Sequence, residues 1–204
     1  MPSLENLVES LKEEGVLKTP KIIEAFLKIK REDFVLDKEW AYLDTALPIG
    51  FNQTISQPLV VAFMLELLEP KEGEKILDIG SGSGWTTALL AYCVSLKGKV
   101  IAIEIIPELK EFGENNVKKY NFIKKGIVKF ILKDGKLGYE KEAPYDKILV
   151  SCSATAVPLA LKKQLKIGGK MVIPIYDSIV EIKKINENNF KEREYPGFVF
   201  VPLK

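Results

Sequence analysis

The chain has 204 residues, 47% of them hydrophobic, which suffices for one well-buried core and is too short for two full catalytic domains. Its 30 basic and 28 acidic residues leave a net charge of only +2, so we expect neither a nucleic-acid nor a membrane partner. Because the chain has no histidine, no C-x-x-C pair and no apolar run of membrane-spanning length, we expect a metal-free cytoplasmic protein without imidazole chemistry.

Two amphipathic helices are predicted at the N-terminus, over residues 3–14 and from Thr19-Pro20 onward, because apolar residues recur at helical spacing in both. A third helix is predicted at about 57–68, before Glu69-Pro70. Ahead of it lies the nearly uncharged stretch LPIGFNQTIS, which we interpret as a loop. Residues 1–69 then form a small helical cap that carries this loop.

Strands and helices alternate after the cap. KILDI, KVIAIE, IVKFIL, YDKILVS and GKMVIPI are typical of buried strands, and the segments that begin at Trp85, Pro107 and Val157 are typical of helices. This alternation predicts an α/β core at about 70–175, with a mostly parallel sheet and helices on both faces. SIVEIKKI and GFVFVPL, within 176–204, are predicted as β segments that add an antiparallel edge. We therefore expect one domain over residues 1–204.

A glycine-rich turn joins the first buried strand to its helix. LDIGSGSGW places Gly80, Ser81, Gly82 and Gly84 there, where backbone without Cβ atoms lets a ligand approach the free N–H groups of a helix N-terminus. A turn that uses glycine for its conformation alone is the alternative. Glu104 ends the next strand, where a carboxylate meets ribose hydroxyls in nucleotide-binding sheets. The pattern predicts a nucleoside site.

Three more residues belong to this predicted site. Asp134 and Gly135 follow the third strand, where an acid can face an adenine amino group. Asp78 precedes the glycines and is predicted to hold the loop or the cofactor's amino group, or merely to end its strand. A dinucleotide fingerprint counted from Gly80 needs a small residue where the chain has Trp85. The observed G-x-G-x-G instead resembles the loop of Rossmann-like class I methyltransferases, whose cofactor is S-adenosylmethionine.

A wider resemblance runs through most of the chain. AYLDTALPIGFNQTIS resembles the segment before the glycine loop in protein-L-isoaspartate (D-aspartate) O-methyltransferases. The likeness continues in order through LDIGSGSG, IEIIPEL, DGKLGYEKEAPYDKILV, LKKQLKIGGKMVIPI and FVPL. It implies methylation of the α-carboxylate of L-isoaspartyl residues in damaged proteins, with isoaspartyl peptides and proteins as partners. A carboxylate is already ionised at neutral pH, so this chemistry needs no histidine.

The resemblance also implies roles for the loop before the third helix. Thr54 and Ser56 are expected to donate hydrogen bonds that position the acceptor carboxylate, which makes LPIGFNQTIS an acceptor loop. Gln53 and Ile55 are expected to line the cofactor side of the same loop. An N-cap at Ser56 for the third helix is the alternative. Asp44 is expected to have a structural role.

The chain departs from the family pattern near the acceptor. Phe51-Asn52 stands where many members have His-Gly, Gln57 replaces a small residue, and Val199 replaces a frequent arginine. Residues 151–152 are expected at the mouth of the cleft, without thiol chemistry. These departures leave open a methyltransferase for another carboxylate, a nucleic acid or a small molecule, or a non-catalytic cofactor-binding adaptor. Oligomeric state is left open too.

Overall fold

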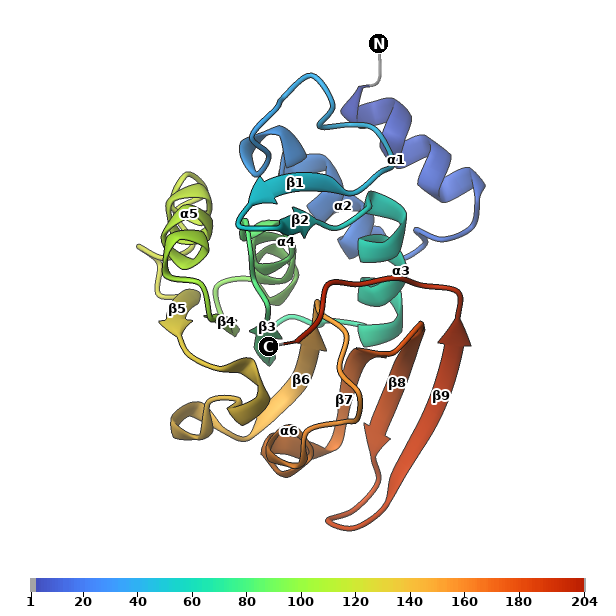
Figure 1. Ribbon diagram of the computed structural model, residues 1–204, viewed down its shortest axis with the longest axis vertical. Helices are drawn as coiled ribbons and strands as arrows, with labels where there is room; N and C mark the ends of the chain where they lie inside the picture. Colours follow the sequence, from blue (N-terminus) through green and yellow to red (C-terminus); the bar gives the residue numbers. More distant parts are fainter. Residues whose placement is uncertain (1–2, 204) are drawn as a thin grey trace.

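The computed structural model describes residues 3–203 and is built on a seven-stranded sheet of order β5-β4-β3-β6-β7-β8-β9 (Figure 1). Strands β5, β4, β3, β6 and β7 are parallel, whereas β8 and β9 are antiparallel to their neighbours. The predicted mostly parallel sheet with an antiparallel edge is confirmed. The strands are β3 (Lys75–Ile79), β4 (Lys99–Glu104), β5 (Val128–Leu132), β6 (Tyr145–Val150), β7 (Leu165–Ile175), β8 (Ser178–Lys184) and β9 (Phe190–Pro196).

Helices cover the two faces of this sheet unequally. Successive strand residues point to opposite faces, so Ile76 packs in the core under α1 to α5 and Leu77 packs in the core under α6. The N-terminal cap rests on α4 through an edge contact between Phe26 and Trp85, whose ring centroids are 5.4 Å apart. No helix among residues 3–203 is long and apolar enough to cross a membrane. The helices are α1 (Leu4–Glu13), α2 (Pro20–Lys28), α3 (Pro58–Leu68), α4 (Trp85–Val94), α5 (Pro107–Lys118) and α6 (Leu159–Gln164), with 3₁₀ turns η1 (Arg31–Asp33), η2 (Gly135–Leu137) and η3 (Glu140–Glu142).

The stretch LPIGFNQTIS is a hairpin, so its prediction as a loop was wrong. Strands β1 (Leu47–Gly50) and β2 (Gln53–Ile55) pair antiparallel in a separate two-stranded sheet. Phe51 and Asn52 join them, and both have a φ of 55°, as a tight hairpin turn requires at its two central positions. The sequence lacked the usual Asn-Gly signal at this turn, and the strands are too short for a clear alternation.

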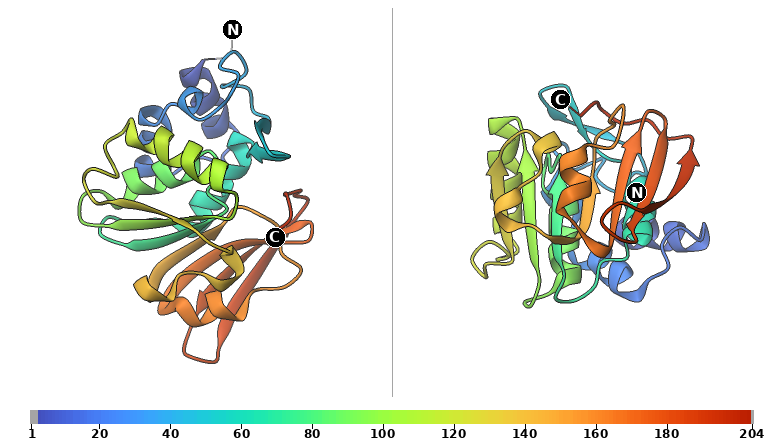
Figure 2. Two further views of the ribbon diagram at one scale, coloured as in Figure 1. Left: turned by 60° about the vertical axis from the view of Figure 1, so that its left-hand side comes forward. Right: turned by 90° about the horizontal axis from the view of Figure 1, so that it is seen from below.

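The C-terminal segment GFVFVPL is not a sheet strand, which corrects a second prediction. The outer antiparallel strand is β9, where the charged run KERE suits an exposed sheet edge and hides the apolar alternation. After β9 the chain turns at Gly197, with a φ of 99°, and residues 198–203 return toward the end of β3 (Figures 1 and 2). Ser153 N donates to Val201 O at 2.8 Å and anchors this tail beside the site.

Candidate active site

A cavity of about 790 Å³, including its part open to solvent, lies at the carboxyl ends of β3, β4 and β6. Its lining comes from the hairpin β1–β2, from the glycine loop and from residues 201–203 of the C-terminal tail. Ligands of open parallel sheets bind at this end of the strands. The predicted residues that line the cavity are Gln53, Thr54, Ile55, Ser56, Gly80, Ser81, Gly82, Glu104 and Gly135.

The glycine loop leaves room where side chains would intrude. Gly80 and Gly82 have positive φ, and a Cβ added at Gly80 would come within 3.0 Å of the Cys152 sulfur. The hydroxyl of Ser81 is buried and has no hydrogen-bond partner among the described residues. Because buried polar groups are nearly always paired, this hydroxyl fits a bound polar ligand.

Gly84 lies outside the cavity lining, unlike the other loop residues. Its φ is +86°, and an added Cβ would stand 2.8 Å from the carbonyl oxygen of Gly113 in α5. The need for glycine at this position therefore comes from the close approach of α5 to the loop. A role of Gly84 in contact with the cofactor stays a prediction, without support from its position.

Glu104 binds the glycine loop directly. Its Oε2 accepts a hydrogen bond from Gly82 N at 2.9 Å, and its Oε1 accepts from Ile105 N at 2.8 Å and Ile106 N at 3.1 Å. The residue is only 6% exposed and lines the cavity. A carboxylate offers about four acceptor positions, so the side chain can hold the loop and still accept a ligand hydroxyl.

Asp134 and Asp78 lie beside the cavity and do not line it. The Asp134 side chain accepts from Lys136 N at 2.8 Å and so caps η2, while the neighbouring Gly135 lines the cavity. Asp78 is fully buried, and its Oδ2 accepts from the Thr87 hydroxyl at 2.6 Å. Its other oxygen has no partner among the described residues. The bond from Thr87 joins β3 to α4, the two elements on either side of the glycine loop, and cofactor contacts of both acids remain predictions.

Replacing Asp78 by asparagine is expected to change how stability depends on pH. Burial, and then the charge of Glu104, raise the pKa of Asp78 from 3.8 to about 7, against the hydrogen bond from Thr87. The native state therefore keeps a proton that the unfolded chain releases. The stabilisation that the neutral carboxyl contributes is fully present below pH 3.8, the pKa in the unfolded chain, and it is lost as the pH rises to about 7. Urea unfolding across this range should show wild type losing stability relative to Asp78→Asn; a pH-independent difference would contradict the burial effect.

A second hollow adjoins the cavity on the side of the C-terminal tail, and we call it the tail groove. Thr54, Ser56, Ser151 and Val201 line both spaces and mark their junction. None of the residues that line the groove carries a charge. The groove residues are Ala46, Thr54, Ser56, Gln57, Leu59, Val60, Ser151, Gly197, Phe198, Val199, Phe200 and Val201.

The alternative role of Ser56 as a helix cap is wrong. The N-cap position of α3 is Gln57, and no side chain at that position caps the helix. Asp44 does so from outside, because its Oδ1 accepts from Leu59 N and its Oδ2 from Gln57 Nε2, both at 2.8 Å. The Ser56 side chain is therefore not needed by α3, and Asp44 has the structural role expected of it.

Some lining residues had no clear signal in the sequence. Lys133 lines the cavity just after β5, and Pro202 and Leu203 reach it through the C-terminal tail. The FVPL motif was part of the family resemblance, but it was predicted as a strand and was therefore not expected to line the site. Burial raises the pKa of Cys152 to about 12, so this lining thiol stays protonated at neutral pH and suits the expected absence of thiol chemistry.

Comparison with known proteins agrees with this geometry. Residues 3–204 match the family model described as protein-L-isoaspartate (D-aspartate) O-methyltransferase. The protein-L-isoaspartate O-methyltransferase of Methanopyrus kandleri is 45% identical over 205 residues, which cover 98% of this chain and 90% of that protein. That of Thermococcus onnurineus is also 45% identical, over 96% of this chain and 90% of its own length. A crystal structure from Plasmodium falciparum, of a putative protein-L-isoaspartate O-methyltransferase with S-adenosyl-L-homocysteine, superposes with a TM-score of 0.91 at 29% identity, covering 100% and 99% of the two chains. The chain belongs to the protein-L-isoaspartate O-methyltransferase family.

Proposed function

We infer that this chain transfers the methyl group of S-adenosylmethionine to the α-carboxylate of L-isoaspartyl residues in damaged proteins. The observation that carries this inference is the meeting of the two hollows at the hydroxyls of Thr54 and Ser56. The cavity contains the glycine loop and Glu104, which are typical of a nucleoside site. The groove beside it opens to solvent and is lined by uncharged residues. A donor and an acceptor bound in the two spaces would meet at this junction.

The cavity residues fit the cofactor. Gly80 and Gly82 leave space for it, the Ser81 hydroxyl lacks a partner, and Glu104 has free acceptor capacity for ribose hydroxyls. S-adenosylmethionine supplies a methyl group activated by a positively charged sulfur. We propose that Gly80, Ser81, Gly82, Glu104, Gly135, Gln53 and Ile55 hold it, and that Asp78, Asp134 and Gly84 support these residues.

The junction suits an acceptor that is already an anion. A carboxylate needs no base before it reacts, and hydroxyl donors can hold it without forming a tight ion pair. Ser56 is half-buried and Thr54 is exposed, so the two hydroxyls mark a path from solvent to the cavity. We propose that Ser56 orients the attacking oxygen and that Thr54 assists. Orientation alone can account for a large part of such a rate, because it replaces a bimolecular encounter.

We propose that the tail groove binds the acceptor, and that its partners are isoaspartyl peptides and proteins. The uncharged groove offers no phosphate-binding lysine or arginine, and nucleic acids bind largely through such contacts, so we propose no nucleic-acid acceptor. Cys93 and Cys152 are both free and buried, which is in keeping with the reducing cytoplasm that we expect.

A labelled-methyl assay tests the proposed function. Purified protein is given labelled S-adenosylmethionine and either an isoaspartyl peptide or the same peptide with normal aspartate. We expect base-labile label on the isoaspartyl peptide alone. Label on RNA, on DNA or on a small carboxylic acid in place of the peptide would support a different acceptor. Absence of transfer to all of them, together with measurable cofactor binding, would support a non-catalytic adaptor.

Ser56→Ala is expected to lower kcat on the isoaspartyl peptide by about tenfold to a hundredfold, since one orienting hydrogen bond is removed. The affinity for S-adenosylhomocysteine should stay within about twofold and the melting temperature nearly unchanged, because the Ser56 hydroxyl caps no helix. Ser56→Thr, which keeps a hydroxyl, is the matched comparison and should retain more activity. Normal turnover by Ser56→Ala would remove Ser56 from the reaction.

A further inference from the structure

Arg31 is a fully buried arginine that binds backbone carbonyls of the acceptor side. It lies in η1, just after α2, and is 0% exposed. Its Nη1 donates to Ala41 O at 2.7 Å, and its Nη2 donates to Thr45 O at 2.9 Å and to Ser56 O at 3.1 Å. One guanidinium group therefore joins the connection before the hairpin to the residue at the junction of the two hollows.

Burial of the Arg31 charge costs free energy, which a side chain with only a packing role would not require. A buried charge is expensive unless it is paired, and an apolar residue of similar volume often serves packing equally well. Nε has no partner among the described residues, and the ring of Trp85 lies 5.3 Å from the guanidinium carbon. The planar guanidinium group of arginine holds its N–H donors in a rigid fork, whereas the ammonium group of lysine is a compact charge without this geometry. The specific property of Arg31 is thus that it holds separate carbonyl groups at fixed relative positions.

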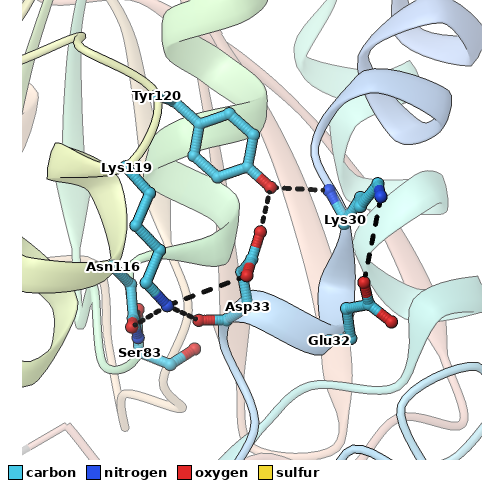
Figure 3. A network of polar contacts seen from close by, with 7 residues as sticks. All are labelled: Lys30, Glu32, Asp33, Ser83, Asn116, Lys119 and Tyr120. Carbon is cyan, nitrogen blue, oxygen red and sulfur yellow. Dashed lines mark hydrogen bonds and ion pairs between the residues drawn. The ribbon is translucent and has the colours of Figure 1, made fainter.

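The same 3₁₀ turn also contacts the cofactor side through the network in Figure 3. Lys119 Nζ donates to Asp33 O at 2.9 Å and to Asn116 Oδ1 at 3.1 Å. The Asn116 amide in turn donates to Ser83 O, within the glycine loop, at 3.0 Å. Tyr120 adds a hydrogen bond to the Asp33 carboxylate at 2.7 Å. The turn η1 is therefore tied to Ser56 at one end and to the glycine loop at the other.

We propose that Arg31 is a positioning residue that sets Ser56 at the correct place relative to the glycine loop. This inference rests on the proposed function, in which Ser56 orients the acceptor oxygen. Without the fork, the Ser56 backbone loses its bond to η1, and the hydroxyl on the same residue loses its fixed distance from the cofactor side. A misplacement of about 1 Å can reduce a rate by about a hundredfold.

Steady-state kinetics of Arg31→Lys and Arg31→Met test this role. Both variants are expected to lower kcat on the isoaspartyl peptide by about tenfold or more, with affinity for S-adenosylhomocysteine within about threefold of wild type. Lysine keeps the charge and loses the fork, so full activity of Arg31→Lys would overturn the proposal. Lys119→Met removes the Nζ bonds to Asp33 O and Asn116 Oδ1 at an exposed position, which keeps the test open if the Arg31 variants unfold. It should lower kcat by about threefold.

Glu66→Gln is the matched control for stability. Glu66 accepts from Lys18 N and Thr19 N at 2.8 Å and from the Thr19 hydroxyl at 2.7 Å, so it ties the start of α2 to the last turn of α3. It should lower the melting temperature and leave kcat unchanged. If Glu66→Gln and the Arg31 variants lost kcat in proportion to stability, or if Lys119→Met kept wild-type kcat, Arg31 would have only a structural role. An inactive wild type would instead reject the proposed function itself.

Discussion

Replacing Glu104 by alanine is expected to weaken binding of S-adenosylhomocysteine by about 1–3 kcal/mol, the range for a lost hydrogen bond to a charged group. The carboxylate accepts from Gly82 N, Ile105 N and Ile106 N, and it lines the cavity. Its loss removes the proposed ribose contact and also frees the glycine loop from the end of β4. Calorimetric titration measures the affinity, and thermal unfolding of the free protein measures the effect on the loop.

Two companion variants separate these effects. Glu104→Gln keeps the shape, but its NH₂ group must face at least one of the three backbone N–H donors, so it should bind little better than the alanine variant. Glu108→Ala removes the same charge from the exposed first turn of α5 and should leave affinity nearly intact. Unchanged affinity of Glu104→Ala for S-adenosylhomocysteine would exclude the ribose role. Glu104 would then only hold the glycine loop in place.

The sequence predicted the sheet and the glycine loop because local patterns determine both. Buried strands such as KILDI are continuous apolar runs, and glycines between a strand and a helix imply close backbone approach. It could not separate the reasons for each glycine. Gly80 and Gly82 line the cavity, whereas Gly84 faces α5, and that difference depends on where a helix more than twenty residues away packs. Asp134 was predicted at the site because it follows the third strand, but its side chain caps its own turn, and its contact with an adenine amino group stays a prediction.

The missed elements depend on contacts distant in sequence or on weak local signals. The hairpin turn uses Phe51-Asn52 at positive φ, where sequence rules favour Asn-Gly. Strand β9 is charged because it is an edge, so it lacks the apolar alternation of an inner strand. Arg31 had no signal in the sequence, since its partners are carbonyl groups that any residue carries. Only the folded chain shows that these groups meet.

Gly113→Ala is expected to destabilise the protein and weaken cofactor binding together. Gly113 is buried in α5, and an added Cβ would stand 2.6 Å from Gly82 O and 3.2 Å from both Gly84 N and the Phe130 ring. The helix itself would gain up to about 1 kcal/mol from alanine. Overpacking against backbone that cannot rotate away typically costs about 1–3 kcal/mol, so the clash should win. Thermal unfolding and calorimetric titration with S-adenosylhomocysteine measure the two effects.

Stability and affinity for S-adenosylhomocysteine should fall together, because the displaced atoms belong to the glycine loop that lines the cavity. Gly82 O meets the new methyl group, and Gly82 N bonds Glu104, so any shift that relieves the clash also disturbs that carboxylate. Asn115→Ala introduces alanine on the exposed face of α5 by shortening a side chain, which raises helix propensity without touching the loop and should leave affinity unchanged. Higher stability in Gly113→Ala would mean that α5 and the loop can move apart freely. The close backbone contact would then have no part in shaping the cofactor site.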